Sequence, residues 1–165
     1  WRSDLPENVT YMSTLSKVGL AGLRIGYCIA PPALARAVNV VRHPYNISST
    51  SLAIAETILR EFADVQDAMI ARTISNRDRL VAILGRIPNA RVFPAHANLA
   101  LVRLEPAEDA PRLAAELARR GILVKDASGL PRLTGCLRIS VGTTAELDLL
   151  EAALAELMPE TRPAT

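Results

Sequence analysis

The residues best suited to chemistry in this sequence are a lysine and an arginine on either side of a glycine-rich turn. Lys17 and Arg24 flank this turn, which lies between two apolar segments. No Asp or Glu occurs between Glu7 and Glu56, so the local sequence supplies no anion to compensate the two cations. Because an unpaired buried cation is costly, we expect an external anion here. A phosphate held by loop N–H groups and side-chain donors fits this pattern.

Lysine is rare in this chain, which draws attention to Lys17. Only two of the 19 basic residues are lysines, Lys17 and Lys125. An amine can lose its proton and act as a nucleophile, whereas a guanidinium cannot. Lys17 is therefore either a reactive amine or a lysine whose ammonium reaches water from a loop, and the residues alone favour neither. Thr14 and Ser16 lie beside it, and their hydroxyls can donate hydrogen bonds to an anion.

A second candidate is Arg138, which lies in an alternating segment. Every second residue from Leu137 to Val141 is apolar, so Arg138 and Ser140 fall on one face of a predicted strand. On this pattern alone, an arginine on the solvent-facing side of an antiparallel strand is the favoured interpretation. The alternative is a guanidinium that binds a carboxylate or a phosphate through two parallel hydrogen bonds.

Composition and motifs disfavour several other functions. The formal net charge of +2 is low for a nucleic-acid-binding protein, and no apolar run is long enough for a transmembrane helix. The sequence has neither the GxGxxG motif of dinucleotide-binding folds nor the GxSxG motif of serine hydrolases. His43 and His96 lack partners at metal-ligand spacing, so we expect no metal site. Cys28 and Cys136 form no CxxC pair and are interpreted as buried thiols in a reducing compartment.

The elements that must position these residues are strands and helices in alternation. We expect strands at 8–15 and 24–30, helices at 31–42 and 48–62, and a long helix at 64–87. There follow strands at 90–94 and 98–104, a helix at 106–120, strands at 122–126 and 137–141, and a last helix that begins with the capping box Thr143-x-x-Glu146. The second half thus predicts a small α+β unit with helices on one sheet face. The first part is typical of the end of a larger α/β domain.

Apolar residues recur at helical spacing in two of these helices. We expect the buried face of the long helix to consist of Ile70, Ile74, Val81 and Leu84. We expect that of the last helix to consist of Leu147, Leu150, Leu154 and Leu157. The residues after Pro159 are expected to be disordered.

The segment around Lys17 resembles a known cofactor site. Residues 16–27, Ser-Lys-Val-Gly-Leu-Ala-Gly-Leu-Arg-Ile-Gly-Tyr, are similar to the cofactor-lysine segment of fold-type I aminotransferases that use pyridoxal phosphate. Three further segments narrow the resemblance to the histidinol-phosphate aminotransferases. They are Thr-Leu at 14–15, Pro-Tyr-Asn at 44–46 and Gly-Cys-Leu-Arg-Ile-Ser-Val-Gly-Thr at 135–143. The resemblance covers nearly the whole chain in order, and the chain is similar to the C-terminal half of such an enzyme.

The resemblance implies a role for each residue of the lysine segment. Lys17 would form a Schiff base with the aldehyde of pyridoxal 5′-phosphate and would then carry a proton between the substrate Cα and the cofactor C4′. Arg24, with Ser16 and Thr14, would hold the cofactor phosphate.

The resemblance also implies a substrate site in the second half. Arg138 would bind the acidic end of the substrate, either the phosphate of histidinol phosphate or the carboxylate of glutamate. Lys125 lies where the family often has a second arginine for the substrate phosphate. The replacement keeps the charge but loses the planar fork of the guanidinium.

The implied fold class is α/β with a small α+β domain. Residues 1–62 would be the C-terminal remnant of the large, parallel-sheet domain that binds the cofactor. Residues 63–165 would be the small C-terminal domain, led by a long interdomain helix. The whole enzyme would be a cytoplasmic homodimer that transfers an amino group between histidinol phosphate and 2-oxoglutarate, with small-molecule substrates and no nucleic-acid or membrane partner.

The start of the chain bears on whether it would act alone. The chain begins at Trp1 without a methionine, and the residues with which the family holds the cofactor ring are not found before Lys17. We therefore expect a fragment that does not transaminate by itself. The alternatives are another enzyme of the same fold, such as an aromatic aminotransferase or a threonine-phosphate decarboxylase, and a non-catalytic interaction domain.

Overall fold

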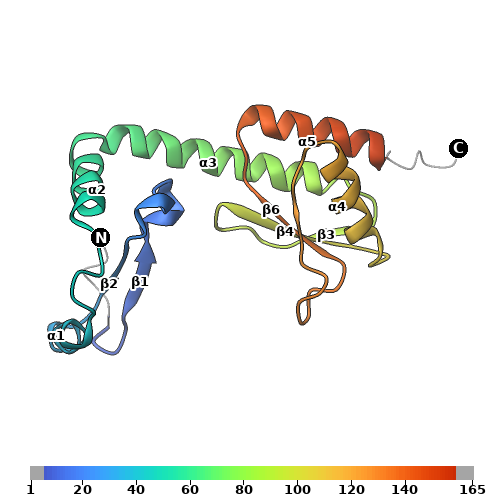
Figure 1. Ribbon diagram of the computed structural model, residues 1–165. Coiled ribbons are helices and arrows are strands. Elements are labelled where there is room, and N and C mark those ends of the chain that lie inside the picture. The colour runs from blue at the N-terminus through green and yellow to red at the C-terminus, as the bar shows by residue number, and fades with distance from the viewer. Residues whose placement is uncertain (1–5, 159–165) are drawn as a thin grey trace, which may run out of the picture. The chain divides into compact units, whose positions relative to one another are not determined.

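Residues 6–158 of the chain are described by the computed structural model (Figure 1). They belong to two units, Trp1–Ile70 and Ala71–Thr165. Helix α3 (Ala63–Leu84) extends across this division. The assignment of residues 1–62 and 63–165 to two domains of a larger enzyme stays a prediction.

The first unit is built on a β-hairpin. Strand β1 (Tyr11–Thr14) pairs antiparallel with β2 (Gly26–Ile29), and Thr14 lies opposite Gly26. Two short 3₁₀ turns, η1 (Leu15–Val18) and η2 (Ala21–Leu23), connect the strands. Both strands are shorter than expected, because the register pairs only Tyr11–Thr14 with Gly26–Ile29. Where β1 ends, the Thr14 side chain accepts a hydrogen bond from the backbone N–H of Ser16.

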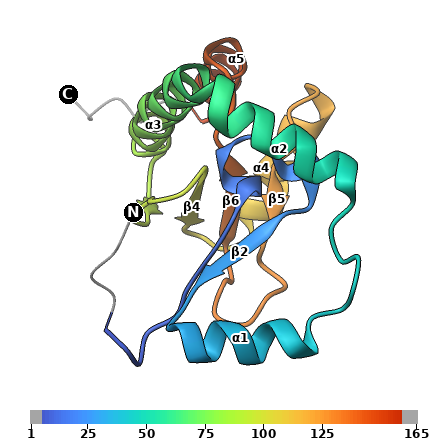
Figure 2. The same cartoon turned by 90° about the vertical axis from the view of Figure 1, so that its left-hand side faces the viewer.

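Two helices complete this unit. Helix α1 (Pro32–Val41) follows β2 and begins at a proline, where the missing N–H costs nothing. Helix α2 (Ser49–Glu61) begins at Ser48, whose side chain accepts a hydrogen bond from the N–H of Ser51. Helix α2 contacts η2, whereas α1 lies at the other end of the hairpin (Figure 2). The buried core is small and consists of Leu15, Ile25 and Ala55.

The second unit contains a four-stranded antiparallel sheet. Its strand order is β3 (Ala90–Val92), β4 (Leu99–Leu104), β6 (Cys136–Ser140) and β5 (Lys125–Asp126). Alternate residues of β4 are buried, so one face of the sheet carries the core. Strand β5 has only two of the five residues expected at 122–126, because β6 pairs only with Lys125 and Asp126.

Helices cover one face of this sheet. Helices α4 (Asp109–Arg119) and α5 (Thr144–Leu157) and the C-terminal part of α3 supply its apolar cover (Figure 1). The capping box at the start of α5 is confirmed, since Thr143 and Glu146 exchange hydrogen bonds. The mixed α/β class is likewise confirmed. None of the helices within residues 6–158 combines the length and the apolar character needed to cross a membrane.

The buried face of α3 differs from the expected one. The residues of α3 that are buried are Asn76, Leu80, Ile83 and Leu84. Of the expected set only Leu84 is fully buried, while Ile74 is 45% exposed. The reason is that the core of the second unit takes its α3 residues only from the C-terminal end of the helix. For α5 the stripe is confirmed at Leu147, Leu150 and Leu154. The residues after Pro159 lie outside the described part of the chain.

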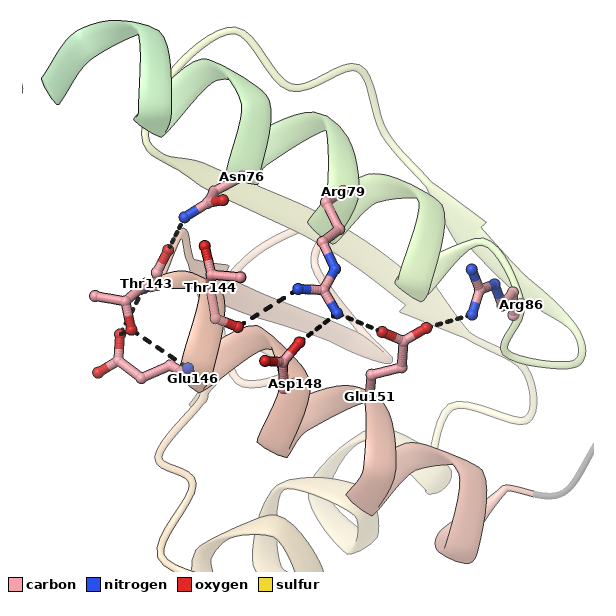
Figure 3. A network of polar contacts seen from close by, with 9 residues as sticks. Asn76, Arg79, Arg86, Thr143, Thr144, Glu146, Asp148 and Glu151 are labelled. Atoms are coloured by element: carbon pink, nitrogen blue, oxygen red, sulfur yellow. Dashed lines mark hydrogen bonds and ion pairs between the residues drawn. The ribbon is translucent and has the colours of Figure 1, made fainter. Parts of the chain in front are cut away.

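Polar side chains of α3 contact α5 and the residues just before it (Figure 3). Asn76 donates from Nδ2 to the carbonyl of Gly142, at 2.9 Å. Arg79 forms ion pairs with Asp148 and Glu151, each at 2.7 Å, and Arg86 also pairs with Glu151. Hydrogen bonds from the two arginines lower the pKa of the Glu151 carboxyl below its ordinary value.

Candidate functional site

Lys17 lies at the end of the hairpin that the two 3₁₀ turns form. The turn is fixed by backbone hydrogen bonds from Leu15 N to the carbonyl of Ile25 (3.0 Å) and from Leu20 N to the carbonyl of Leu15 (3.1 Å). Leu15, two residues before the lysine, is buried in the core of the unit. The backbone that carries Lys17 is therefore anchored on the inner side, while the lysine itself is exposed.

Thr14, Ser16 and Arg24 lie at the same end of the hairpin. The hydroxyl oxygen of Thr14 is 3.0 Å from the Ser16 hydroxyl and 3.1 Å from the carbonyl of Ile25, the residue after Arg24. Arg24 has a left-handed backbone with φ of 57°, which is uncommon for a residue with a side chain. All four residues expected at the cofactor thus lie at this end of the hairpin, and their role there stays a prediction.

Two further residues, both in α3, support this turn and were not among the residues expected at the site. Gln66 donates from Nε2 to the carbonyl of Val18, at 3.2 Å. A Cβ on Gly19 would lie 3.3 Å from Cε of Met69, and Gly19 has φ of +88°. Both contacts join residues about fifty positions apart, and the local pattern around Lys17 carries no signal for them.

The expectation that Lys17 and Arg24 are buried is wrong for this chain. Both residues are exposed, because a two-stranded hairpin with a three-residue core cannot enclose long side chains. The cost of burying a charge therefore does not itself require an anion here. What remains is the chemistry of the donor set: two hydroxyls and a guanidinium suited to a phosphate, and a primary amine suited to an aldehyde. A left-handed arginine among them is the kind of backbone strain found at ligand sites. These residues fit a ligand that carries both groups.

Arg138 and Lys125 lie opposite each other in the second unit. They are direct partners in the register of β6 and β5, and both are exposed. The alternation expected for this strand is confirmed, since Leu137 and Ile139 are 0% and 5% exposed. Like charges directly opposite each other in a sheet are unfavourable, so this pair favours a bound anion. The pairing depends on register between segments distant in sequence and could not be predicted.

The two cysteines lie in different surroundings. Cys136 is buried and Cys28 is exposed, and neither forms a disulfide. The buried-thiol interpretation is therefore wrong for Cys28, which lies on the open hairpin. Between residues 6 and 158, no group of three or more His, Cys, Asp or Glu side chains is placed to hold a metal ion.

Comparison with known proteins identifies the family. Residues 3–154 match the family model described as aminotransferase class I and II. The chain belongs to this family.

Individual relatives narrow the resemblance. The chain is 41% identical over 153 residues to a histidinol-phosphate aminotransferase of Thermoanaerobacter sp. (strain X514), and 40% identical over 149 residues to one of Chromobacterium violaceum. These matches cover 92% and 90% of this chain but only 42% and 41% of the relatives. The chain thus spans about two fifths of the length of the curated relatives that it matches.

Solved structures of related enzymes have the same fold as this chain. The histidinol-phosphate aminotransferase of Sinorhizobium meliloti in complex with pyridoxal-5′-phosphate is 31% identical, with a TM-score of 0.78 over 92% of this chain and 41% of that chain. A decarboxylase from Sulfurospirillum multivorans is 26% identical, with a TM-score of 0.81 over 94% of this chain and 45% of that chain. The fold-type I architecture expected from the sequence is therefore confirmed.

Proposed function

We propose that this chain is part of a pyridoxal-phosphate-dependent aminotransferase that transfers an amino group between histidinol phosphate and 2-oxoglutarate. The observation that carries the proposal is the placement of Lys17, Thr14, Ser16 and Arg24 at one end of the β1–β2 hairpin. The relatives named histidinol-phosphate aminotransferase support the substrate. A homodimer in the cytoplasm remains part of the proposal for the whole protein.

The amine of Lys17 is the reacting group of this chain. Pyridoxal phosphate, when bound, supplies an aldehyde that combines with amines and a ring that stabilises negative charge on an adjacent carbon. Lys17 would hold that aldehyde through Nζ. Released by the incoming amino substrate, the same Nζ would accept the proton of the substrate α-carbon and hold it for return to the cofactor. A guanidinium could do neither, which explains a lysine at this position in an arginine-rich chain.

The neighbours of Lys17 orient the cofactor phosphate. Arg24 contributes a permanent charge and a planar fork of N–H donors, and Ser16 and Thr14 contribute hydroxyl donors. The 3₁₀ turn η1 places Ser16 directly before Lys17, so that fixing the phosphate also fixes the position of the reacting amine.

Arg138 and Lys125 bind the acidic group of the substrate. Their direct cross-strand pairing provides two adjacent cations on one face of the sheet. A phosphate or a carboxylate removes the repulsion between them, so binding is favoured by the relief of an unfavourable contact as well as by attraction.

A decarboxylase of the same fold is the second candidate. It is favoured by the similarity to the Sulfurospirillum multivorans decarboxylase. Such an enzyme would use the same amine and the same phosphate donors but would release carbon dioxide from the substrate and would need no 2-oxoglutarate.

A chimera separates these activities. The chain would replace the matching two fifths of the Thermoanaerobacter relative, to which it is 41% identical. We expect the chimera to form glutamate from histidinol phosphate and 2-oxoglutarate, and a Lys17→Ala chimera to lose at least a thousandfold in rate, a loss of the size seen when a catalytic nucleophile is removed. A folded chimera that releases carbon dioxide from phosphothreonine and forms no glutamate would overturn the proposal in favour of the decarboxylase.

A further inference from the structure

The face of the four-stranded sheet opposite its helices carries a cation on every strand. Arg91 of β3 lies directly opposite Arg103 of β4, and Lys125 of β5 lies opposite Arg138 of β6. The neighbours of Arg103 along β4, Val102 and Leu104, are buried in the core, so Arg103 belongs to the other face. The substrate role proposed above accounts for Lys125 and Arg138 but leaves the pair Arg91 and Arg103 unexplained.

Both arginines make cation–π contacts with one aromatic ring, that of Phe93. The Cζ atoms of Arg91 and Arg103 lie 5.1 Å and 5.5 Å from the centroid of the Phe93 ring, within the range of cation–π attraction. Arg103 also donates from Nη2 to the carbonyl of Arg132, at 2.8 Å, while its buried Nε has no hydrogen-bond partner. The two guanidiniums are thus fixed in place before any ligand binds, which lowers the entropy cost of binding.

No acidic side chain compensates this pair in the described part of the chain. The ion pairs found within residues 6–158 include neither Arg91 nor Arg103. The nearest acid in the register is Glu105, two residues beyond Arg103, and it forms no ion pair with either arginine. By contrast, the helix arginines Arg79 and Arg119 each have a carboxylate partner.

We propose that Arg91, Arg103 and Phe93 form a docking surface for a carboxylate-rich protein segment. Charge complementarity favours carboxylates, and Arg together with aromatic residues is typical of protein interfaces. Nucleic acid is disfavoured because the Phe93 ring is already engaged by two guanidiniums and the net charge is only +2.

Binding of a fluorescent octaglutamate peptide to the 165-residue chain tests this proposal. We expect saturable binding, seen as a rise in anisotropy, that weakens at least about tenfold in the Arg91→Gln, Arg103→Gln double variant. The matched control is Arg36→Gln with Arg42→Gln, which removes the same charge from α1 and from the residue that follows it and should change the affinity less than about twofold. Because Arg103 is partly buried, the single variant Arg91→Gln is measured as well and should weaken binding without altering the circular dichroism spectrum.

Three results would overturn the proposal. They are the absence of saturable binding, an equal loss of affinity in both double variants, and displacement of the peptide by equimolar tripolyphosphate or oligouridine. The last would assign the face to a small oxyanion or to RNA. The assay is independent of the aminotransferase activity, because it uses neither cofactor nor substrate.

Discussion

At the scale of single residues, Asn76 shows what one buried polar side chain contributes. It is 8% exposed on α3, and its Nδ2 donates to the carbonyl of Gly142, two residues after the strand that carries Arg138. Asn76→Ala leaves that carbonyl without its partner, so we expect a loss of about 1–3 kcal/mol in the free energy of unfolding. Urea denaturation measures it. Ser75→Ala, at an exposed neighbouring position, should change stability by less than about 0.5 kcal/mol, and equal effects would contradict this account.

Glu151 makes stability depend on pH. Hydrogen bonds from Arg79 and Arg86 lower its pKa in the folded state below the ordinary value of 4.5. Its carboxylate therefore stabilises the fold at neutral pH, and this contribution is lost as the pH falls below 4.5 through the folded-state pKa. We expect Glu151→Gln to lower the melting temperature at pH 7 and to have a smaller effect at pH 3.

The control for this pH dependence is Glu108→Gln, at an exposed position. It should leave the shape of the pH profile unchanged. A Glu151→Gln profile parallel to that of the wild-type chain at every pH would show that the ion pairs with α3 do not stabilise the fold.

The face of the strand on which a residue lies could be predicted from the sequence more readily than the residues that it contacts. The alternation around Arg138 placed that arginine on the solvent-facing side of its strand, as the structure confirms. The lysine segment predicted a shared cofactor role for Thr14, Ser16, Lys17 and Arg24. All four lie at one end of the hairpin, and the role itself stays a prediction. The cross-strand partners Lys125 and Arg91 could not be predicted, because they depend on the register of segments far apart in the chain.

At the scale of elements, the turn that carries Lys17 depends on Gly19. Its φ of +88° is a conformation that residues with a Cβ adopt only at a cost, and the added atom would lie 3.3 Å from Cε of Met69. We expect Gly19→Ala to cost about 1–2 kcal/mol. It should also slow the reaction of Lys17 with pyridoxal phosphate, because the amine is then held less firmly.

Gly22 provides the matched control in the same connection. A Cβ on Gly22 would meet no atom within 4 Å, and its backbone is not left-handed. Gly22→Ala should therefore leave stability and the rate of reaction of Lys17 nearly unchanged. Equal effects of the two substitutions, followed by thermal unfolding and by absorbance, would show that the turn does not need a left-handed residue.

Helices were predicted more accurately than strands. The caps at Ser48 and Thr143 are local signals, and both helices begin where these caps place them. The strand expected at 122–126 is reduced to two residues, because a strand needs a partner and β6 supplies one only at Lys125 and Asp126. The buried face of α3 was misplaced for the same reason, since burial depends on which part of the helix meets the sheet.

At the scale of the whole molecule, the two units differ in how much core they contain. The core of the second unit combines residues of the sheet with those of three helices, whereas the buried core among the described residues of the first unit consists of Leu15, Ile25 and Ala55. Both outer edges of the β1–β2 hairpin are unpaired within the described residues. We therefore expect backbone amides of β4 and β6 to exchange with deuterium far more slowly than those of β1 and β2.

Hydrogen exchange followed by mass spectrometry measures this difference. Equal protection of the hairpin and of the four-stranded sheet would contradict this expectation.

The fold class could be predicted from the resemblance, but the exposure of Lys17 could not. The chain spans about 42% of the length of the first relative. Motifs that lie within one segment could therefore be identified, whereas the residues that surround the site in a longer relative could not.

Lys17 is the amine that we propose captures the cofactor aldehyde. The chain has two lysines, so treatment with pyridoxal phosphate and sodium borohydride followed by peptide mass spectrometry gives a clear result. We predict that the label is found on Lys17, persists in Lys125→Arg and is lost from the lysine side chains in Lys17→Arg. Labelling of Lys125 to the same extent, or of neither lysine, would contradict the account.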